Sequence, residues 1–336
     1  MRLVVDKKVF VWVMLAAICA ACNMLVFKHQ YVDFYSIFQG IDSTDGFNNQ
    51  LVDAYRAIRS GFDFTPYGKD EWLGYVHVVR LITTTPFFVL EKLFGAPGQT
   101  IAMYYVVCVS IFTIRRSANI YYFLPLLIFP LVMSWRSALV FLSIIVFLSY
   151  YVDKHSGVLR LIMGATLASL SSASLVFIFI ATLYLAYGRA RRLGALGLIF
   201  ILYLGFMVWA VVEAKIYGFY SGSVGYSLND AGPLQSIIMR STVVVKIGQG
   251  APLKAAIFAL FALFLMFKAL KVLFPRRRTI VNRLLLFSMF GVLVEGLGVM
   301  VIGAMLLLSY SGFRIEPDMG RLPRRTGGSS QLELTN

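Results

Sequence analysis

The sequence has 336 residues, of which 59% are hydrophobic and only 14% are charged. A soluble domain of this length needs a shell of charged side chains, and this composition excludes one. The formal net charge is +15, and the excess bases lie in short linkers between apolar segments. Basic residues in such linkers indicate the cytoplasmic side of a membrane protein and contact with anionic lipid headgroups, rather than a nucleic-acid partner.

Long apolar segments follow one another along the chain, and they suit a hydrocarbon core about 30 Å thick. The first apolar segment follows the basic residues Arg2, Lys7 and Lys8 in the sequence. It is long for a secretory signal, so it predicts an uncleaved signal anchor. The segments cover residues 9–27, 75–94, 99–114, 119–134, 137–152, 159–187, 194–212, 253–274 and 283–312.

The stretch 28–72 has the opposite charge bias, with seven acids against four bases, and we expect it outside the cell membrane. If every basic linker is cytoplasmic, segment 75–94 cannot be a complete transmembrane span. A complete span there would place the linker with Arg115 and Arg116 on the outer side of the membrane. This segment also holds His77 and Arg80, which are costly against lipid. It therefore predicts a re-entrant or periplasm-facing helix.

Two later segments are too long for one crossing. Segment 159–187 would make a helix of about 43 Å. Ser171, Ser172 and Ser174 interrupt it at the midpoint. We expect two short helices that turn on the outer side. Segment 283–312 carries Glu295 and Gly296 at its middle, which predicts a second hairpin.

The predicted fold is an all-α polytopic membrane protein with about 9–10 transmembrane helices plus the re-entrant or periplasmic helix. One transmembrane domain covers residues 1–315, with outer loops at 28–74 and 213–252. The polar stretch 316–336 has the composition of a disordered tail.

Arg136 is the most informative candidate on the outer face. It lies between two apolar segments, at a boundary where the positive-inside bias disfavours a base. Its fork of donors suits a diphosphate or a carboxylate; the alternative is a snorkelling side chain beside Trp135. Helical spacing puts Arg80 and His77 on one face, where Arg80 binds substrate or pairs with a carboxylate.

The two outer loops mix aromatic, amide and charged side chains, which suit sugar rings and hydroxyls. A loop carboxylate near the bilayer is also a candidate general base for an acceptor hydroxyl. Three His without paired spacing and no cysteine cluster predict neither a metal nor another cofactor. The candidate bases are Asp63, Asp70 and Glu71, and the other candidate substrate-binding residues are Arg59, Tyr67, Trp135, Ser172, Tyr220 and Arg240.

The order of features over residues 30–240 resembles the Wzy-type polymerases of O-antigen and exopolysaccharide, especially their EpsG-like branch. The matching stretches are RSGFDFTPYGKDEWLGYVHVVRLI, WRSALVFLSIIVFLSYYVDKHSG, LASLSSASLVF and a loop rich in Tyr, Ser and Gly. The family usually has Gln after the Arg that Arg136 matches, where this chain has Ser137. It usually has His near the position of Ser172.

The resemblance implies a membrane-embedded, GT-C-like glycosyltransferase in the bacterial inner membrane. It would move a glycan from an undecaprenyl-diphosphate carrier onto a lipid-linked repeat unit at the periplasmic face. Arg136, helped by Arg80 or Arg240, would neutralise the departing diphosphate, and a loop carboxylate would take the acceptor's proton. The implied partners are the lipid-linked oligosaccharide, membrane lipids and a chain-length regulator protein.

Two other functions remain open. A transporter or flippase for a lipid-linked substrate predicts broken helices at mid-membrane and symmetric halves, and no repeat is visible. A membrane acyltransferase that modifies glycans generally uses a membrane-embedded His, and this chain has only three His. Polar residues that gather on one face favour the polymerase.

Overall fold

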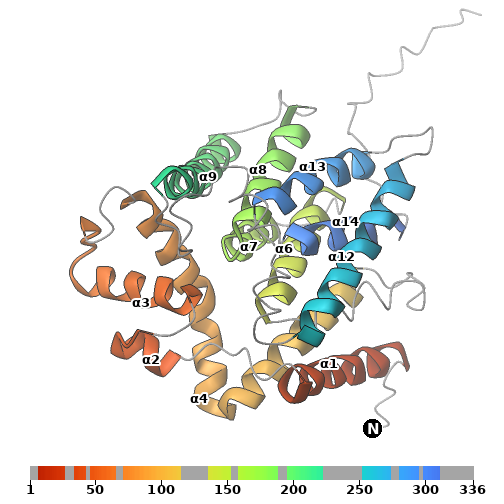
Figure 1. Cartoon of the computed structure of the whole chain (residues 1–336), viewed down its shortest axis with the longest axis horizontal. Coiled ribbons are helices and arrows are strands. Elements are labelled where there is room, and N and C mark those ends of the chain that lie inside the picture. Colours follow the sequence, from red (N-terminus) through yellow and green to blue (C-terminus); the bar gives the residue numbers. More distant parts are fainter. Residues whose placement is uncertain are drawn as a thin grey trace, which may run out of the picture.

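The computed structural model describes residues 7–26, 34–42, 46–65, 71–114, 135–152, 158–187, 195–221, 252–273, 280–294 and 298–310. Nearly all of these residues are helical and none of them forms a strand, which confirms the all-α class for this part of the chain. The helices form one bundle (Figure 1).

The first half of the chain contains three shorter helices and one long one. They are α1 (Lys7–Val26), α2 (Phe34–Gln39), α3 (Gly46–Arg59) and α4 (Glu71–Ile114). The long helix α4 kinks at Gly95, where φ is 69°, and Pro97 lies two residues further on. A left-handed φ favours glycine, and proline cannot donate to the preceding turn, so the two halves of α4 run in different directions (Figure 1).

The described helices of the second half vary from 11 to 27 residues. They are α6 (Trp135–Val152), α7 (Val158–Ala168), α8 (Ser172–Tyr187), α9 (Ala195–Ser221), α12 (Pro252–Leu273), α13 (Ile280–Val294) and α14 (Gly298–Tyr310). Helices α13 and α14 pack against each other, as the predicted hairpin in 283–312 requires. Segment 119–134 lies outside the described residues.

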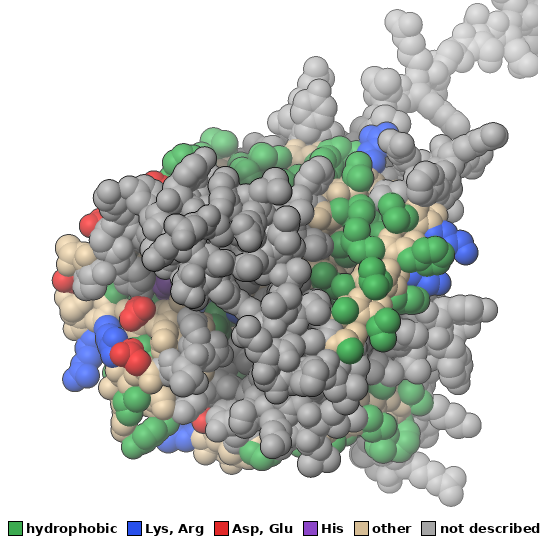
Figure 2. All heavy atoms as spheres, in the orientation of Figure 1, with side chains coloured by type: hydrophobic (Ala, Val, Ile, Leu, Met, Phe, Trp, Pro, Cys, Tyr) green, Lys and Arg blue, Asp and Glu red, His purple; other side chains and the backbone are tan. Residues whose placement is uncertain are grey.

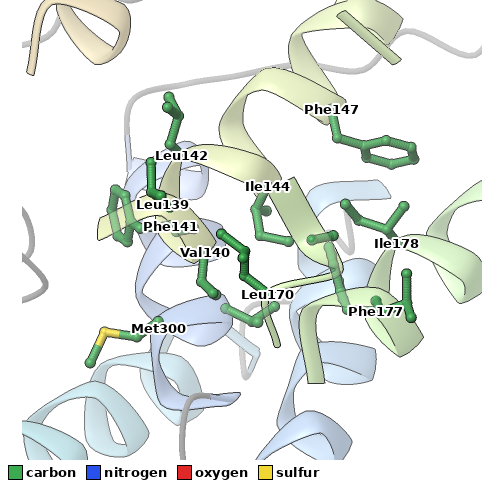
Figure 3. Packing of buried hydrophobic residues seen from close by; sticks show 14 of the residues in the cluster. Leu139, Val140, Phe141, Leu142, Ile144, Phe147, Leu170, Phe177, Ile178 and Met300 are labelled. Atoms are coloured by element: carbon green, nitrogen blue, oxygen red, sulfur yellow. The ribbon is translucent and has the colours of Figure 1, made fainter. Parts of the chain in front are cut away.

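Helix α6 is the centre of the bundle, because its residues 137–149 are all buried. It contacts α4, α7, α8 and α14. Gly164 allows α7 to approach α6 closely, because a Cβ there would lie 2.8 Å from the Cα of Phe147. Figure 3 shows the α6 side chains packed with Leu170, Phe177, Ile178 and Met300, from the α7–α8 connection, α8 and α14.

The peripheral helices expose apolar side chains. On α12 these include Leu260, Leu263 and Phe267, each about two-thirds exposed, at helical spacing along one face. Figure 2 shows hydrophobic side chains over α12, and acidic side chains on the opposite side, where α2 and α3 lie. Apolar faces that point outward from a packed bundle are typical of helices in contact with lipid.

Two helices in the described residues are long and apolar enough to cross a membrane, namely Glu71–Gly95 of α4 and Ala195–Ala214 of α9. Helices α6, α7, α8 and α13 are apolar but shorter. The sequence thus encodes a helical protein with membrane-compatible helices. The expected total of nine or ten spans and the GT-C-like arrangement stay predictions.

The re-entrant geometry expected for segment 75–94 finds no support in the structure. The helix runs without a break from Glu71 to the kink at Gly95, a length of about 36 Å, enough for a complete crossing. The hydroxyls of Thr83, Thr84 and Thr85 each donate to a carbonyl four residues earlier.

Parts of the two ranges expected to be outer loops are helical. Residues 34–39 and 46–59 of loop 28–74 are helical, and α9 continues to Ser221, well into the expected loop 213–252. The predicted loop boundaries were drawn from the polarity of the sequence. Amphipathic helices also contain many polar residues, so polarity alone does not distinguish them from loops. Helix α12 begins at Pro252, and the first turn of a helix is a position that suits proline.

Candidate functional site

The break between α7 and α8 is the structural centre of the candidate site. Helix α7 ends at Ala168 and α8 begins at Ser172, as the serine-rich midpoint of segment 159–187 predicted. Serine competes with the helix by bonding nearby main-chain groups, and it is favoured at helix starts. Ser171 occupies the N-cap position of α8, because its carbonyl accepts the N–H of Leu175 at 3.0 Å.

Most carbonyls around the break are satisfied locally. The carbonyls of residues 165–168 each accept a main-chain N–H from residues 169–171. The hydroxyl of Ser174 adds bonds to the carbonyls of Ala168, at 2.8 Å, and Ser171, at 2.9 Å. Two consecutive carbonyls remain, those of Ser169 and Leu170, and each accepts a hydrogen bond from an arginine.

Arg80 supplies the first of these bonds. Its side chain is 4% exposed, and its Nε donates to the carbonyl oxygen of Ser169 at 2.6 Å. Its Nη1 donates to Oε1 of Gln50 on α3, also at 2.6 Å. A main-chain carbonyl and a neutral amide thus fix a cationic group inside the bundle. His77, one turn earlier on α4, is equally buried.

Arg136 supplies the second bond from the first turn of α6. Its Nε donates to the carbonyl oxygen of Leu170 at 2.7 Å. Its guanidinium carbon lies 4.3 Å from the centroid of the Phe47 ring on α3, a cation–π contact. The side chain is partly buried, and the planar guanidinium suits both the carbonyl and the aromatic face.

Helix α3 covers both arginines. Phe47 and Gln50 are three residues apart and lie on one face of α3, next to the buried Leu51 and Ala54. We call the group formed by Arg80, Arg136, the carbonyls of Ser169 and Leu170, Gln50 and Phe47 the arginine site. It unites α3, α4, α6 and the α7–α8 break, which are separated in the sequence.

The arginine site has the electrostatics of an anion site. Two guanidinium groups meet at two consecutive residues that immediately precede the N-terminus of α8. The helix N-terminus adds partial positive charge, and the protein interior screens little. Phosphate, diphosphate and carboxylate groups are the ligands that guanidinium forks hold best. No group of three or more His, Cys, Asp or Glu among the described residues could hold a metal ion.

The structure brings together three of the sequence-predicted residues, Arg80, Arg136 and Ser172. Ser172 is buried at the first position of α8, directly after the break. Arg59 and Glu71 lie elsewhere, exposed at the end of α3 and the start of α4. Each terminal position suits the charge of its residue, because acids favour helix N-termini and bases favour C-termini.

Asp63 lies in the loop between α3 and α4. Its carboxylate accepts the hydroxyl of Thr65 at 2.6 Å and the N–H of Thr65 at 2.9 Å. These bonds favour the ionised form and lower the pKa of Asp63 below its ordinary value. A lower pKa makes a weaker base, so the environment of Asp63 suits accepting hydrogen bonds better than abstracting protons.

The remaining candidates are described incompletely or not at all. Trp135 and Tyr220 lie in α6 and α9, where only their backbone is described. Tyr67, Asp70 and Arg240 lie outside the described residues.

Phe47 and Gln50 were not identified from the sequence. A signal was present, because Phe47, Leu51, Ala54 and Ile58 recur at helical spacing within the polar segment. This periodicity predicts an amphipathic helix, and Gln50 lies one turn after Phe47 on the side that faces the bundle. The charge bias of segment 28–72 drew attention to its acids instead.

Comparison of the chain with protein-family models, with curated proteins and with solved structures finds no match.

Proposed function

We propose that the protein is a polysaccharide polymerase of the membrane-embedded, GT-C-like kind, acting on undecaprenyl-diphosphate-linked glycans at the periplasmic face of a bacterial inner membrane. The observation that carries the proposal is the convergence of Arg80 and Arg136 on two consecutive carbonyls at the α7–α8 break. The resemblance of the sequence motifs to Wzy-type polymerases supports the same function.

The proposed role of the arginine site follows from the charge change in the reaction. Transfer of the glycan breaks the bond between the anomeric carbon and the carrier's diphosphate, which leaves with an additional negative charge. Guanidinium groups that are fixed before the reaction stabilise this charge without a reorganisation cost. The acceptor hydroxyl forms the new glycosidic bond and loses its proton to a carboxylate or to water.

The surroundings of the site fit a lipid-linked substrate. Apolar faces on α4, α9 and α12 offer contact with acyl or polyprenyl chains, while acids on α3 and the α3–α4 loop offer acceptors for hydroxyls. The diphosphate linkage already carries the driving force, so the proposed reaction needs no nucleotide.

The decisive variant is Arg136→Gln in the native cell. Glutamine keeps a donor for the Leu170 carbonyl but removes the positive charge. We expect loss of the long-chain ladder of surface polysaccharide, survival of the single-repeat band, and normal amounts of protein in the membrane. Arg136→Ala should lose the ladder as well.

The matched control is Arg283→Gln. Arg283 is an exposed arginine on α13 that donates to the hydroxyl of Tyr184 at 3.0 Å, also a neutral oxygen on another helix. We expect a wild-type ladder in this variant. A wild-type ladder in Arg136→Gln, with the control also normal, would remove Arg136 from the reaction and refute the proposal.

A flippase for the lipid-linked repeat unit is the second candidate, and the break between α7 and α8 favours it. Transporters often place a discontinuous helix, with its N-terminus toward an anionic substrate, at the binding site. The same gel separates the two functions. A flippase variant loses every band, including the single repeat, because no substrate reaches the outer face.

A further inference from the structure

A second surface of defined chemistry lies where the α3–α4 loop meets the start of α4. It consists of exposed aromatic rings and one exposed carboxylate. Phe62 is 59% exposed, Trp72 is 49% exposed and Tyr75 is 43% exposed. Asp63 follows Phe62 directly. We call these four residues the aromatic surface.

The rings of the aromatic surface are held in fixed orientations. The ring of Trp72 stacks on Tyr75, with centroids 6.0 Å apart and planes 27° apart. The edge contact between Trp72 and Phe206 of α9, at 5.5 Å and 88°, fixes the ring from another direction. Exposed rings that keep one orientation lose little entropy when a ligand binds.

The loop is anchored so that Phe62 and Asp63 stay beside those rings. Phe64 is buried, contacts the ring of Tyr75 at 4.4 Å, and lies over Gly74, where any Cβ would meet its ring at 2.3 Å. Phe62 adopts a φ of 65°, which is unfavourable for a residue with a bulky side chain. The Phe64 anchor therefore helps to hold an exposed ring and its neighbouring carboxylate in place.

The chemistry of this surface matches a sugar. One face of a pyranose ring presents C–H groups, and the negative face of an aromatic ring attracts them. The Asp63 carboxylate, kept ionised by Thr65, offers strong acceptors for sugar hydroxyls. Lipid fits less well, because a carboxylate is costly against acyl chains and is repelled by anionic headgroups.

The position of the aromatic surface also fits the arginine site. Trp72 precedes Arg80 by eight residues on one continuous helix, which corresponds to about 12 Å along the axis. A short oligosaccharide spans such a distance. A diphosphate at the arginine site would therefore leave its attached sugars within reach of the rings.

We propose that Phe62, Asp63, Trp72 and Tyr75 form a binding subsite for the glycan part of a lipid-linked substrate. The proposal rests on the proposed function for the identity of the substrate. It deepens that function by separating a sugar-binding surface from the diphosphate-binding arginines.

The test measures binding without transfer. The full chain in lipid nanodiscs is titrated with the soluble oligosaccharide released by mild acid from the native cell's surface polysaccharide, followed by saturation-transfer NMR. We expect saturable binding to the wild type. Trp72→Leu and Asp63→Asn should each weaken it roughly tenfold, the scale of one ring contact or one charge-assisted hydrogen bond.

Two matched variants separate sugar binding from general effects. Trp209→Leu removes an exposed tryptophan from α9, and Asp42→Asn removes an exposed carboxylate that pairs with Arg56. Both should bind the oligosaccharide like the wild type. All variants are checked for unchanged melting temperature, and Trp72→Phe provides a milder change if Trp72→Leu is unstable.

Three outcomes would overturn the subsite. These are no saturable binding to the wild type, equal affinity in all variants, or a pattern in which Trp72→Leu and Trp209→Leu both impair nanodisc incorporation while oligosaccharide affinity stays constant. The last pattern would identify the rings as a lipid-interface belt. Binding that needs Trp72 and Asp63 would stand even if Arg136→Gln leaves the ladder intact, so the two proposals fail separately.

Discussion

Two interruptions of apolar helices, the α7–α8 break and the kink of α4 at Gly95, are handled by different chemistry. At the kink, Gln99 is fully buried and its Nε2 donates to the carbonyl of Phe87 at 2.9 Å, so a neutral amide ties the two halves of α4 together. At the break, Arg80 and Arg136 donate to consecutive carbonyls.

The difference shows that charge is not required to satisfy main-chain groups in this bundle. Serines, threonines and glutamine do so elsewhere, without the cost of placing a cation in a low-dielectric interior. A neutral donor would satisfy each of the two carbonyls, so the positive charge of the two arginines exceeds the structural need. This excess is the physical reason to place anion binding at the break rather than at the kink.

The variant with the largest expected effect tests the difference between the break and the kink directly. Arg80→Met removes the donors to the Ser169 carbonyl and to Gln50, and we expect a loss of about 2–6 kcal/mol in the free energy of unfolding, from two unsatisfied acceptors. Gln99→Leu removes one neutral bond at the kink and should cost about 1 kcal/mol. Thermal unfolding of both variants in the same detergent measures the difference.

A polysaccharide ladder that shortens only in proportion to the loss of stability, in Arg80→Met as in Gln99→Leu, would show that Arg80 does no more than tie helices together. Arg80→Gln sharpens the result, because it keeps a donor of similar reach. It should recover part of the stability while polysaccharide ladders stay absent.

A smaller effect is expected from moving the break away from the arginines. Gly164→Ala places a Cβ 2.7 Å from Cβ and 2.8 Å from Cα of Phe147, so α7 must shift away from α6. Such overpacking costs about 1–3 kcal/mol and displaces the carbonyls at the end of α7. Melting temperature and ladder length should both fall.

Gly303→Ala is the control for this change. A Cβ at Gly303 meets its nearest atom, in the Phe141 ring, at 3.5 Å, which is an ordinary contact. We expect little change in melting temperature and a normal ladder. Similar losses at both glycines would indicate that helix packing in general, and not the position of the break, limits activity.

The smallest expected effect is a shift in the pH dependence of oligosaccharide binding at the aromatic surface. It leaves the α7–α8 break and the kink of α4 unchanged. Thr65→Val removes the hydroxyl bond to Asp63, so the pKa of Asp63 should rise toward its ordinary value of 3.8. Because the folded pKa is lowered, the ionised form persists as pH falls and is lost only below the ordinary carboxyl range. As pH is lowered, oligosaccharide binding should therefore be lost at a higher pH in Thr65→Val than in the wild type. Loss of binding at the same pH in both proteins would exclude Asp63 from the binding surface.

Several elements followed from the sequence because their signals are local. The helix break at residues 169–171 was predicted from the serines that interrupt a segment too long for one crossing, and the pairing of α13 with α14 from a polar midpoint. The helices α2 and α3 were missed because polarity was read as loop. Segment 75–94 was expected to be re-entrant or periplasm-facing. The structure shows a continuous helix there that buries His77 and Arg80, and its placement relative to the membrane stays a prediction.

The sequence by itself determined a helical chain with membrane-compatible segments and marked Arg80, Arg136 and the serine cluster as unusual, since burial cost and helix propensity depend on residue type. Only the tertiary structure decided that both arginines meet at the α7–α8 break under Phe47 and Gln50. Those contacts join residues up to 89 positions apart, and no local pattern specifies which distant carbonyl a guanidinium will bind. Packing around the buried helix α6 makes that choice.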